Sequence, residues 1–262
     1  ASGIICGHLL ECTGQVVGGN SLALLDEMSP AALAHPGYPI AVVDEDGSFV
    51  VTKTPDTAGR VSVTTVKEQL LYEMHDPAAY ITPDVVADVT TLRLADDGPD
   101  RVRVTGVTGH PRTETLKVNI ARLEGYSREL LFLLGWPAVW HKEEQLRGML
   151  AEAWQGLPIK RVEYSHPGLD SLYGPLEPPP ADPLELVVRV MLTADDQDTL
   201  KAAVRRAMAL GLSGPAGMSV SGTSVGADPR YLLGLWPALV RRELVEPGIH
   251  IDMREVEGDG NG

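Results

Sequence analysis

The alternation of hydrophobic and polar positions predicts helices and hairpins in the first part of the chain. Residues 4–12 are mostly apolar and are typical of a helix, and a glycine-rich turn follows them. Residues 40–43 and 48–52 have the composition of strands and flank an Asp-Glu-Asp-Gly turn, whose Asp-Gly pair favours the positive φ angles of a hairpin. A Thr-x-x-Glu capping box at Thr65 then predicts the start of a second amphipathic helix.

Three further runs in this part have the composition of strands. Residues 85–94 and 101–107 are joined by an acidic turn that contains glycine and proline, and residues 116–120 form another alternating run. Hairpins that alternate with one or two helices are typical of an α+β arrangement and not of regular βαβ winding.

From about residue 127 the pattern changes to longer elements. Their predicted order is a helix at 139–154, strands at 159–164 and 184–192, a helix at 195–210 and strands at 239–245 and 249–253. This order can pack as a small split-βαβ sandwich. The proline-rich segment 175–183 has no helical potential, and we interpret it as a stiff surface connector.

These patterns together predict an α+β (mixed α/β) fold with two domains. A hairpin-rich N-terminal part is expected over residues 1–125 and the split-βαβ sandwich over residues 126–256. The polar, glycine-rich residues 257–262 are expected to form a disordered tail.

Composition restricts the class of partner and the compartment. The 262 residues carry a formal net charge of -14, which disfavours nonspecific binding to nucleic acid or anionic membranes. No apolar run is long enough for a membrane helix and no signal peptide is visible, so we expect a cytoplasmic protein. In that compartment Cys6 and Cys12 should both be reduced.

The polar residues of the opening segment are the main candidates for chemistry. His8 lies three residues before Glu11 and four before Cys12, so a helix would place all three on one side of a turn. His8 or Glu11 could transfer protons as a general acid or base, and Cys12 could act as a nucleophile with His8 as its base. The alternative is a buried structural helix whose polar groups are satisfied by neighbours.

Residues after this helix are candidates for substrate binding. Gly18 and Gly19, followed by Asn20, would let the backbone come close to a ligand or to another chain segment. Lys53 ends the predicted hairpin and could meet a carboxylate or phosphate, or it could be a solvated surface lysine.

Both His110 and His166 fall in predicted loops, where solvated histidines are expected.

The common cofactor and metal motifs are not found in the sequence. It has no Walker loop, no dinucleotide fingerprint, no HExxH and no G-x-S-x-G elbow. His8, Glu11 and Cys12 could each bind zinc or iron, but three ligands from a single helical turn would be crowded. We therefore expect no metal, and the sequence leaves the cofactor unknown.

The opening segment also supports a family resemblance. From Gly7 to Gly19 it reads Gly-His-aliphatic-aliphatic-Glu-Cys-x-x-Gln-x-x-Gly-Gly, which resembles the AtuA-like proteins of acyclic terpene utilisation. The likeness continues in colinear order through Gly37-Tyr38-Pro39, Gly47-Ser48-Phe49, Thr52-Lys53, Gly59, Glu68 to Glu73, Asp76-Pro77, Tyr80, Thr82 to Val85 and Lys117-Val118.

The resemblance implies a role in the catabolism of small branched acyl-CoA or carboxylate compounds. It suggests a component with lyase, hydratase or isomerase chemistry on a CoA thioester or carboxylate, in which His8 and Glu11 transfer protons. Lys53 and Lys117 would hold the anionic substrate. A noncatalytic docking subunit of a hetero-oligomeric complex is the alternative.

The resemblance further implies that members of this family have an additional α/β half before the segment that corresponds to His8. This resemblance leaves three origins for the chain: a piece cut from a longer protein, a processed product or a natural half. We favour the last two, and for a natural half we expect that a partner polypeptide supplies the N-terminal half and that the two form a hetero-oligomer.

Overall fold

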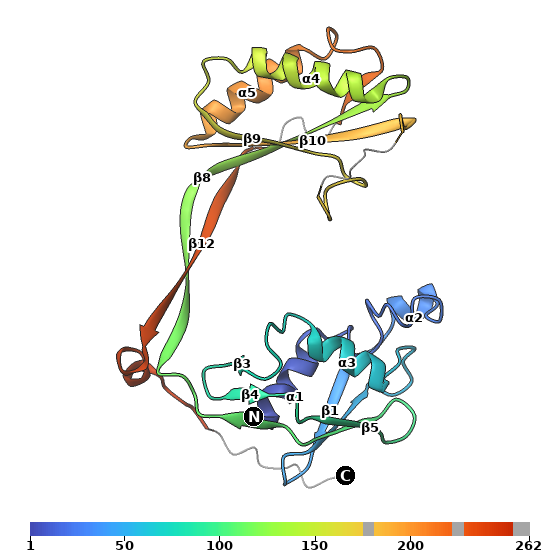
Figure 1. Cartoon of the computed structure of the whole chain (residues 1–262), viewed down its shortest axis with the longest axis vertical. Helices are drawn as coiled ribbons and strands as arrows, with labels where there is room; N and C mark the ends of the chain where they lie inside the picture. Colours follow the sequence, from blue (N-terminus) through green and yellow to red (C-terminus); the bar gives the residue numbers. More distant parts are fainter. Residues whose placement is uncertain (175–180, 222–227, 254–262) are drawn as a thin grey trace. The chain divides into compact units, whose positions relative to one another are not determined.

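The computed structural model describes residues 1–174, 181–221 and 228–253, which fall into two compact units. The first unit comprises Ala1–Lys117 with Leu239–Gly262, and the second comprises Val118–Ala238. Figure 1 shows the helices and strands of both. The boundary thus lies near residue 117, whereas the sequence pattern placed it at residue 125. Residues 257–262 and most of the proline-rich connector lie outside the described residues.

The first unit contains two small antiparallel sheets and three helices. Its larger sheet has the order β1-β2-β6-β5, with bounds β1 Pro39–Val43, β2 Phe49–Lys53, β5 Arg93–Asp96 and β6 Val102–Thr105. Its smaller sheet, β3-β4-β7, consists of β3 Tyr80–Ile81, β4 Val86–Asp88 and β7 Thr108–His110. The helices are α1 Ser2–Glu11, α2 Pro30–Ala34 and α3 Val63–Leu71.

A single hydrophobic cluster joins α1 and α3 to these strands. Ile5 and Leu9 lie four residues apart on one side of α1, and both are fully buried with Phe49 and Val51 of β2. Val66 of α3 belongs to the same cluster. The core therefore fixes the buried side of α1, which also carries His8.

Most elements predicted for this unit are confirmed, with two corrections. The hairpin of β1 and β2 has the expected position, and its strands pair with Val43 opposite Phe49. Helix α3, however, begins after Ser62 and not at Thr65, because the hydroxyls of Ser62 and Thr65 reciprocally accept hydrogen bonds from each other's backbone N–H groups. The run 85–94 is not one strand, because Val89 to Leu92 turn between β4 and β5, which belong to different sheets.

The second unit is a split-βαβ sandwich, as the sequence predicted. Its sheet has the order β11-β8-β10-β9, and β12 also pairs with β8. The elements are β8 Thr115–Gly135, α4 Val139–Ala153, β9 Ile159–Ser165, β10 Glu185–Ala194, α5 Gln197–Ala209, β11 Met218–Val220 and β12 Arg230–Arg241. Alternate residues of β10 are buried in one cluster with residues of α4 and α5, so the two helices cover one face of the sheet (Figure 1).

The closing strands predicted at 239–245 and 249–253 are wrong. The chain instead forms β12 and then two short 3-10 turns, Arg242–Leu244 and Glu246–Gly248. Arg242 holds the first turn, because its side chain donates to the backbone oxygens of Thr113 and Pro83. Gly234 and Pro237 hid β12 in the sequence, since proline is rare within strands except at an edge.

Candidate functional site

His8 is buried on α1 and both of its ring nitrogens have partners. Its Nε2 lies 3.1 Å from the backbone oxygen of Leu70, and its Nδ1 lies 3.5 Å from the hydroxyl of Tyr80. Because a carbonyl oxygen can only accept, Nε2 carries a proton, and Nδ1 of the singly protonated ring accepts from Tyr80. The Nε2 of Gln69 donates to the backbone oxygen of His8 at 2.9 Å and fixes this part of the helix.

Tyr80 connects His8 to a cavity of about 590 Å³ in the first unit. The ring of Tyr80 lies 5.3 Å from that of His8, measured between centroids, and it also lines the cavity. The cavity is lined by Glu73, His75, Asp76, Ala79, Tyr80, Ile81, Thr113, Thr115, Lys117 and Leu239. Its volume falls in the range of about 300–1,000 Å³ that is typical of small-molecule sites.

The charges of two acidic residues, Glu11 and Glu73, act on the phenol of Tyr80. Burial is the first cause that raises the pKa of the Tyr80 phenol, and the charges of Glu11 and Glu73 raise it further. Tyr80 therefore keeps its proton at neutral pH. The pKa of nearby Tyr72 is also raised, mainly by the charge of Glu73 and then by a hydrogen bond to it.

The three catalytic candidates do not form a single cluster. His8 is buried, whereas Glu11 is exposed and Cys12 caps the C-terminal end of α1. Within the described residues no hydrogen bond joins His8 to Glu11 or to Cys12. The helical spacing brings Glu11 close enough to influence Tyr80, but it does not give Cys12 a base.

Of the two candidate lysines, only Lys117 lines this cavity. Lys53 ends β2 as predicted, but its side chain is only 8% exposed and its Nζ lies 3.5 Å from Asp100. The same Nζ donates to the backbone oxygen of Thr57 at 2.7 Å. The charge of Lys53 is therefore already engaged within the fold.

The glycine-rich turn packs against the chain itself. The backbone N–H of Gly18 donates to Gln15, and that of Gly19 donates to Gly14. A Cβ on Gly19 would lie 2.8 Å from the backbone oxygen of Gly14, and Gly18 has a φ of +101°. Glycine is required here for the turn, and Asn20, with a φ of 56°, continues the left-handed backbone.

Sequence reasoning missed Tyr80, Glu73, His75 and Asp76 as parts of a site. Glu73, His75 and Asp76 share a signal, which is the dense group of titratable residues directly after α3, in the stretch 72–76. The described part of the chain contains no cluster of ligands suited to a metal ion.

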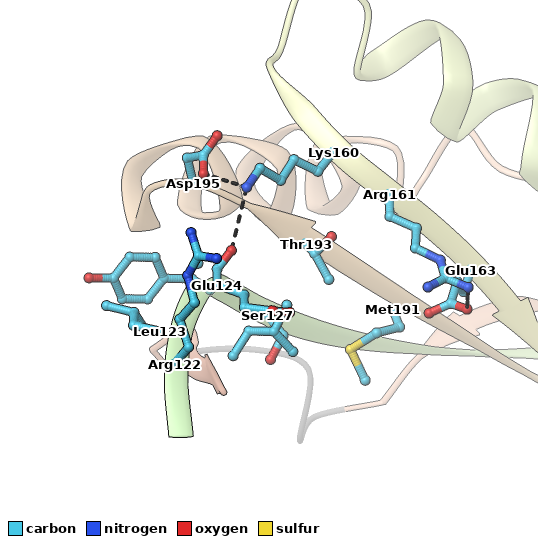
Figure 2. Close-up of a pocket in the computed structure, with 13 residues that line it drawn as sticks. Arg122, Leu123, Glu124, Ser127, Lys160, Arg161, Glu163, Met191, Thr193 and Asp195 are labelled. Carbon is cyan, nitrogen blue, oxygen red and sulfur yellow. Dashed lines mark hydrogen bonds and ion pairs between the residues drawn. The ribbon is translucent and has the colours of Figure 1, made fainter. Parts of the chain in front are cut away.

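A second cavity, of about 990 Å³, lies in the second unit (Figure 2). Charged residues of β8, β9 and the end of β10 line it, and most are paired with one another. Lys160 lies 2.5 Å from Asp195, and Arg161 lies 2.6 Å from Glu163. Because most of its charged side chains form ion pairs with one another, this cavity is less suited than the first to bind a charged substrate or to transfer a proton.

The expectation that His166 is a solvated loop residue is wrong. His166 is 7% exposed, and its Nδ1 and Nε2 lie 2.6 Å and 3.3 Å from Asp170 and Glu143. Arg147 also forms an ion pair with Glu143. The hydrogen bond to Glu143 is the main cause that raises the pKa of His166, and a hydrogen bond to Asp170 adds to it. His110, in contrast, is exposed as expected, although it is the last residue of strand β7 and not part of a loop.

Comparison with known proteins places this molecule among proteins of acyclic terpene utilisation. The model of the family described as "Acyclic terpene utilisation family protein AtuA" matches residues 1–251. The chain therefore belongs to the AtuA family, as the opening motif suggested. No curated protein and no solved structure matches it. Among the residues that the structure describes, no helix is both long and apolar enough to cross a membrane.

Proposed function

We propose that this chain is the component of an AtuA-family enzyme that transfers a proton to or from a small branched acyl-CoA or carboxylate. The reaction would be of the lyase, hydratase or isomerase type, and the CoA thioester would be a substrate and not a resident cofactor. Family membership supports a role in acyclic terpene utilisation. The observation that carries the proposal is the contact between buried His8 and Tyr80 at the wall of the cavity.

In this proposal Tyr80 and His8 form a two-step proton relay. The Tyr80 oxygen takes a proton from substrate while the phenol proton passes to Nδ1 of His8, and the reverse sequence delivers a proton. The Leu70 carbonyl holds the His8 ring in the tautomer that this transfer needs. Glu11 contributes through its charge, which favours the protonated phenol.

Lys117 supplies the positive charge for the anionic part of the substrate. It lines the same cavity as Tyr80, together with the hydroxyl-bearing Thr113 and Thr115. The proposal assigns a structural role, without substrate contact, to four other candidates: Gly18, Gly19, Asn20 and Lys53. Cys12 keeps the role of a candidate nucleophile, which a Cys12→Ser variant tests.

A deuterium-exchange experiment tests the proposal. Lyases, hydratases and isomerases of this kind all move a proton at the carbon next to the thioester carbonyl, so wild-type protein should exchange that proton of isovaleryl-CoA with solvent deuterium. Tyr80→Phe should slow the exchange about 100-fold, the scale of general acid–base catalysis. Mass spectrometry of the recovered thioester measures the rate.

Tyr173→Phe is the matched control, because Tyr173 is 92% exposed and lies in the second unit. It should exchange at the wild-type rate. Full exchange by Tyr80→Phe would remove Tyr80 from the mechanism. Lack of exchange by wild-type protein, supplied with its partner if one is found, would exclude the enzymatic role and leave the docking role below.

A noncatalytic docking role is the second candidate, and the edge strand β1 favours it. Three residues of this strand, Ile40, Val42 and Val43, are 40%, 47% and 61% exposed, and β1 is the outer strand of its sheet. An exposed apolar edge strand commonly receives a partner strand. The proposed partner is a cytoplasmic polypeptide that supplies the α/β half expected from the family, in a hetero-oligomer.

Copurification with this companion, followed by Val42→Lys, distinguishes the two roles. If docking is the whole function, Val42→Lys abolishes copurification, and substitutions in the cavity change neither assembly nor the rate of deuterium exchange. If the chain is catalytic, Tyr80→Phe stops exchange while assembly persists.

A further inference from the structure

One edge of β8 is open in the second unit. Strand β10 pairs with β8 only from Tyr126 to Gly135, where Ala194 is opposite Tyr126. Strand β12 and the short β11 lie along the other edge, since β11 pairs with Leu134 to Phe132 and β12 continues beside β8. Within the described residues no strand pairs with residues 118–124 on the β10 side.

The ribbon formed by these residues and β12 is unusually apolar for an exposed structure. Exposed fractions are 38% for Val118, 50% for Ile120 and 51% for Leu123 on β8. On β12, Leu235 and Trp236 are 71% and 52% exposed. A two-stranded ribbon is marginally stable by itself in water, and large exposed apolar patches usually mark interfaces. Within the second unit, the described residues leave these apolar side chains uncovered.

The two edges of the ribbon differ in their protection against pairing. Strand β12 contains Pro237, which has no backbone N–H to donate, and proline within a strand disfavours pairing with a further strand. Residues 118–124 of β8 contain no proline, and they include the β-branched Val118 and Ile120. The β8 edge is thus the one suited to receive a strand.

We propose that the open edge of β8 pairs with the same edge of a second copy of this chain. A two-fold axis at Ile120 gives an antiparallel pairing in which Ile120 faces its own copy and Val118 faces Arg122. In this register Asn119 faces Ala121, Val118 meets the aliphatic stem of Arg122, and no like charges are opposite. The product is a four-stranded sheet with the order β12-β8-β8-β12.

Charge also favours a second copy at this place. The whole chain carries a formal net charge of -14, so two copies repel each other over most of their surface. Residues 118–124 are neutral, since Arg122 is balanced by Glu124. The cavity beside them, shown in Figure 2, is lined by equal numbers of acidic and basic residues, with Lys160 paired to Asp195 and Arg161 to Glu163. Two copies can approach here without net repulsion.

Mass measurement with a charged variant tests the pairing. In sedimentation velocity at about ten micromolar, well above the dissociation constant expected for a specific interface, the wild-type chain should have twice its 28.1 kDa mass. Ile120→Lys should sediment at 28.1 kDa, since two lysines would face each other at the axis. Leu172→Lys, at a residue that is 89% exposed in the same unit, should remain a dimer.

A cross-link provides a second test that does not depend on a disruptive variant. Opposite residues of antiparallel strands lie about 4.5–5.5 Å apart between Cα atoms, which allows a disulfide. In a Cys6→Ser, Cys12→Ser background, Ile120→Cys should therefore form a covalent dimer on mild oxidation, and Leu172→Cys should not. A monomeric wild-type chain, a dimer that survives Ile120→Lys, or equal cross-linking at both positions would overturn the proposal.

Discussion

His8 and His166 are both buried, but the partners of their rings differ. His8, in the first unit, contacts a backbone carbonyl and the Tyr80 phenol, and that phenol lines a cavity. His166, in the second unit, lies between the carboxylates of Asp170 and Glu143. Two neighbouring carboxylates favour the cationic form of a histidine, whereas the proposed relay requires a partner such as a phenol that can give up and regain a proton. The difference lies in the second partner and not in burial.

This comparison predicts that His166 matters for stability and not for reaction. His166→Ala would leave Glu143, which is 7% exposed, without one of its two positive partners. Breaking a buried ion pair typically costs about 3–5 kcal/mol, so unfolding of the second unit in urea should lose about 3 kcal/mol. Exchange at the Tyr80 cavity should persist in the folded variant. A wild-type free energy of unfolding would contradict this assignment.

The two candidate lysines extend the comparison to substrate binding. Lys117→Ala should raise the KM for isovaleryl-CoA about tenfold with little change in kcat, because an exposed cation that contacts the anion contributes about 1.4 kcal/mol. Lys53→Met should leave KM unchanged and reduce thermal stability instead, since Lys53 is paired with Asp100. The reverse result, with KM sensitive to Lys53 alone, would place the anion elsewhere.

The pH dependence of the free energy of unfolding is a smaller effect, and we expect it to depend on His166. The raised pKa of His166 means that its contribution is fully present below its unfolded pKa of about 6.5 and is lost as pH rises through the folded value. Hydrogen bonds to His166 lower the pKa of Glu143 and Asp170 despite their desolvation, so their contribution is lost as pH falls through the folded values. Urea midpoints for wild type and His166→Gln measure both slopes, and only the wild type should show the alkaline loss.

Sequence patterns predicted much of the fold because local signals and burial agreed there. The hairpin of β1 and β2 follows from the Asp-Gly turn, and α4, β9, β10 and α5 of the second unit follow from apolar periodicity. The patterns failed where long-range pairing decided the outcome. The sequence pattern predicted a strand only over residues 116–120, whereas β8 continues through Gly125, whose φ of +131° and missing Cβ let the backbone of Ala194 approach closely.

The site was only partly visible for a related reason. The spacing of His8 and Glu11 on one helix is a local property, so the sequence located both. The contact between His8 and Tyr80 spans 72 residues and depends on how α1 packs against α3. Likewise, the sequence does not distinguish Lys53 from Lys117 as a free cation. Only the fold shows that Lys53 forms an ion pair with Asp100.

A double-mutant cycle on His8 and Tyr80 tests the central claim most directly. If the two residues form one relay, His8→Gln and Tyr80→Phe should each slow deuterium exchange into isovaleryl-CoA about 100-fold, and the double variant should be no slower than either single variant. Losses that multiply in the double variant would show that the residues act independently, and they would contradict the relay.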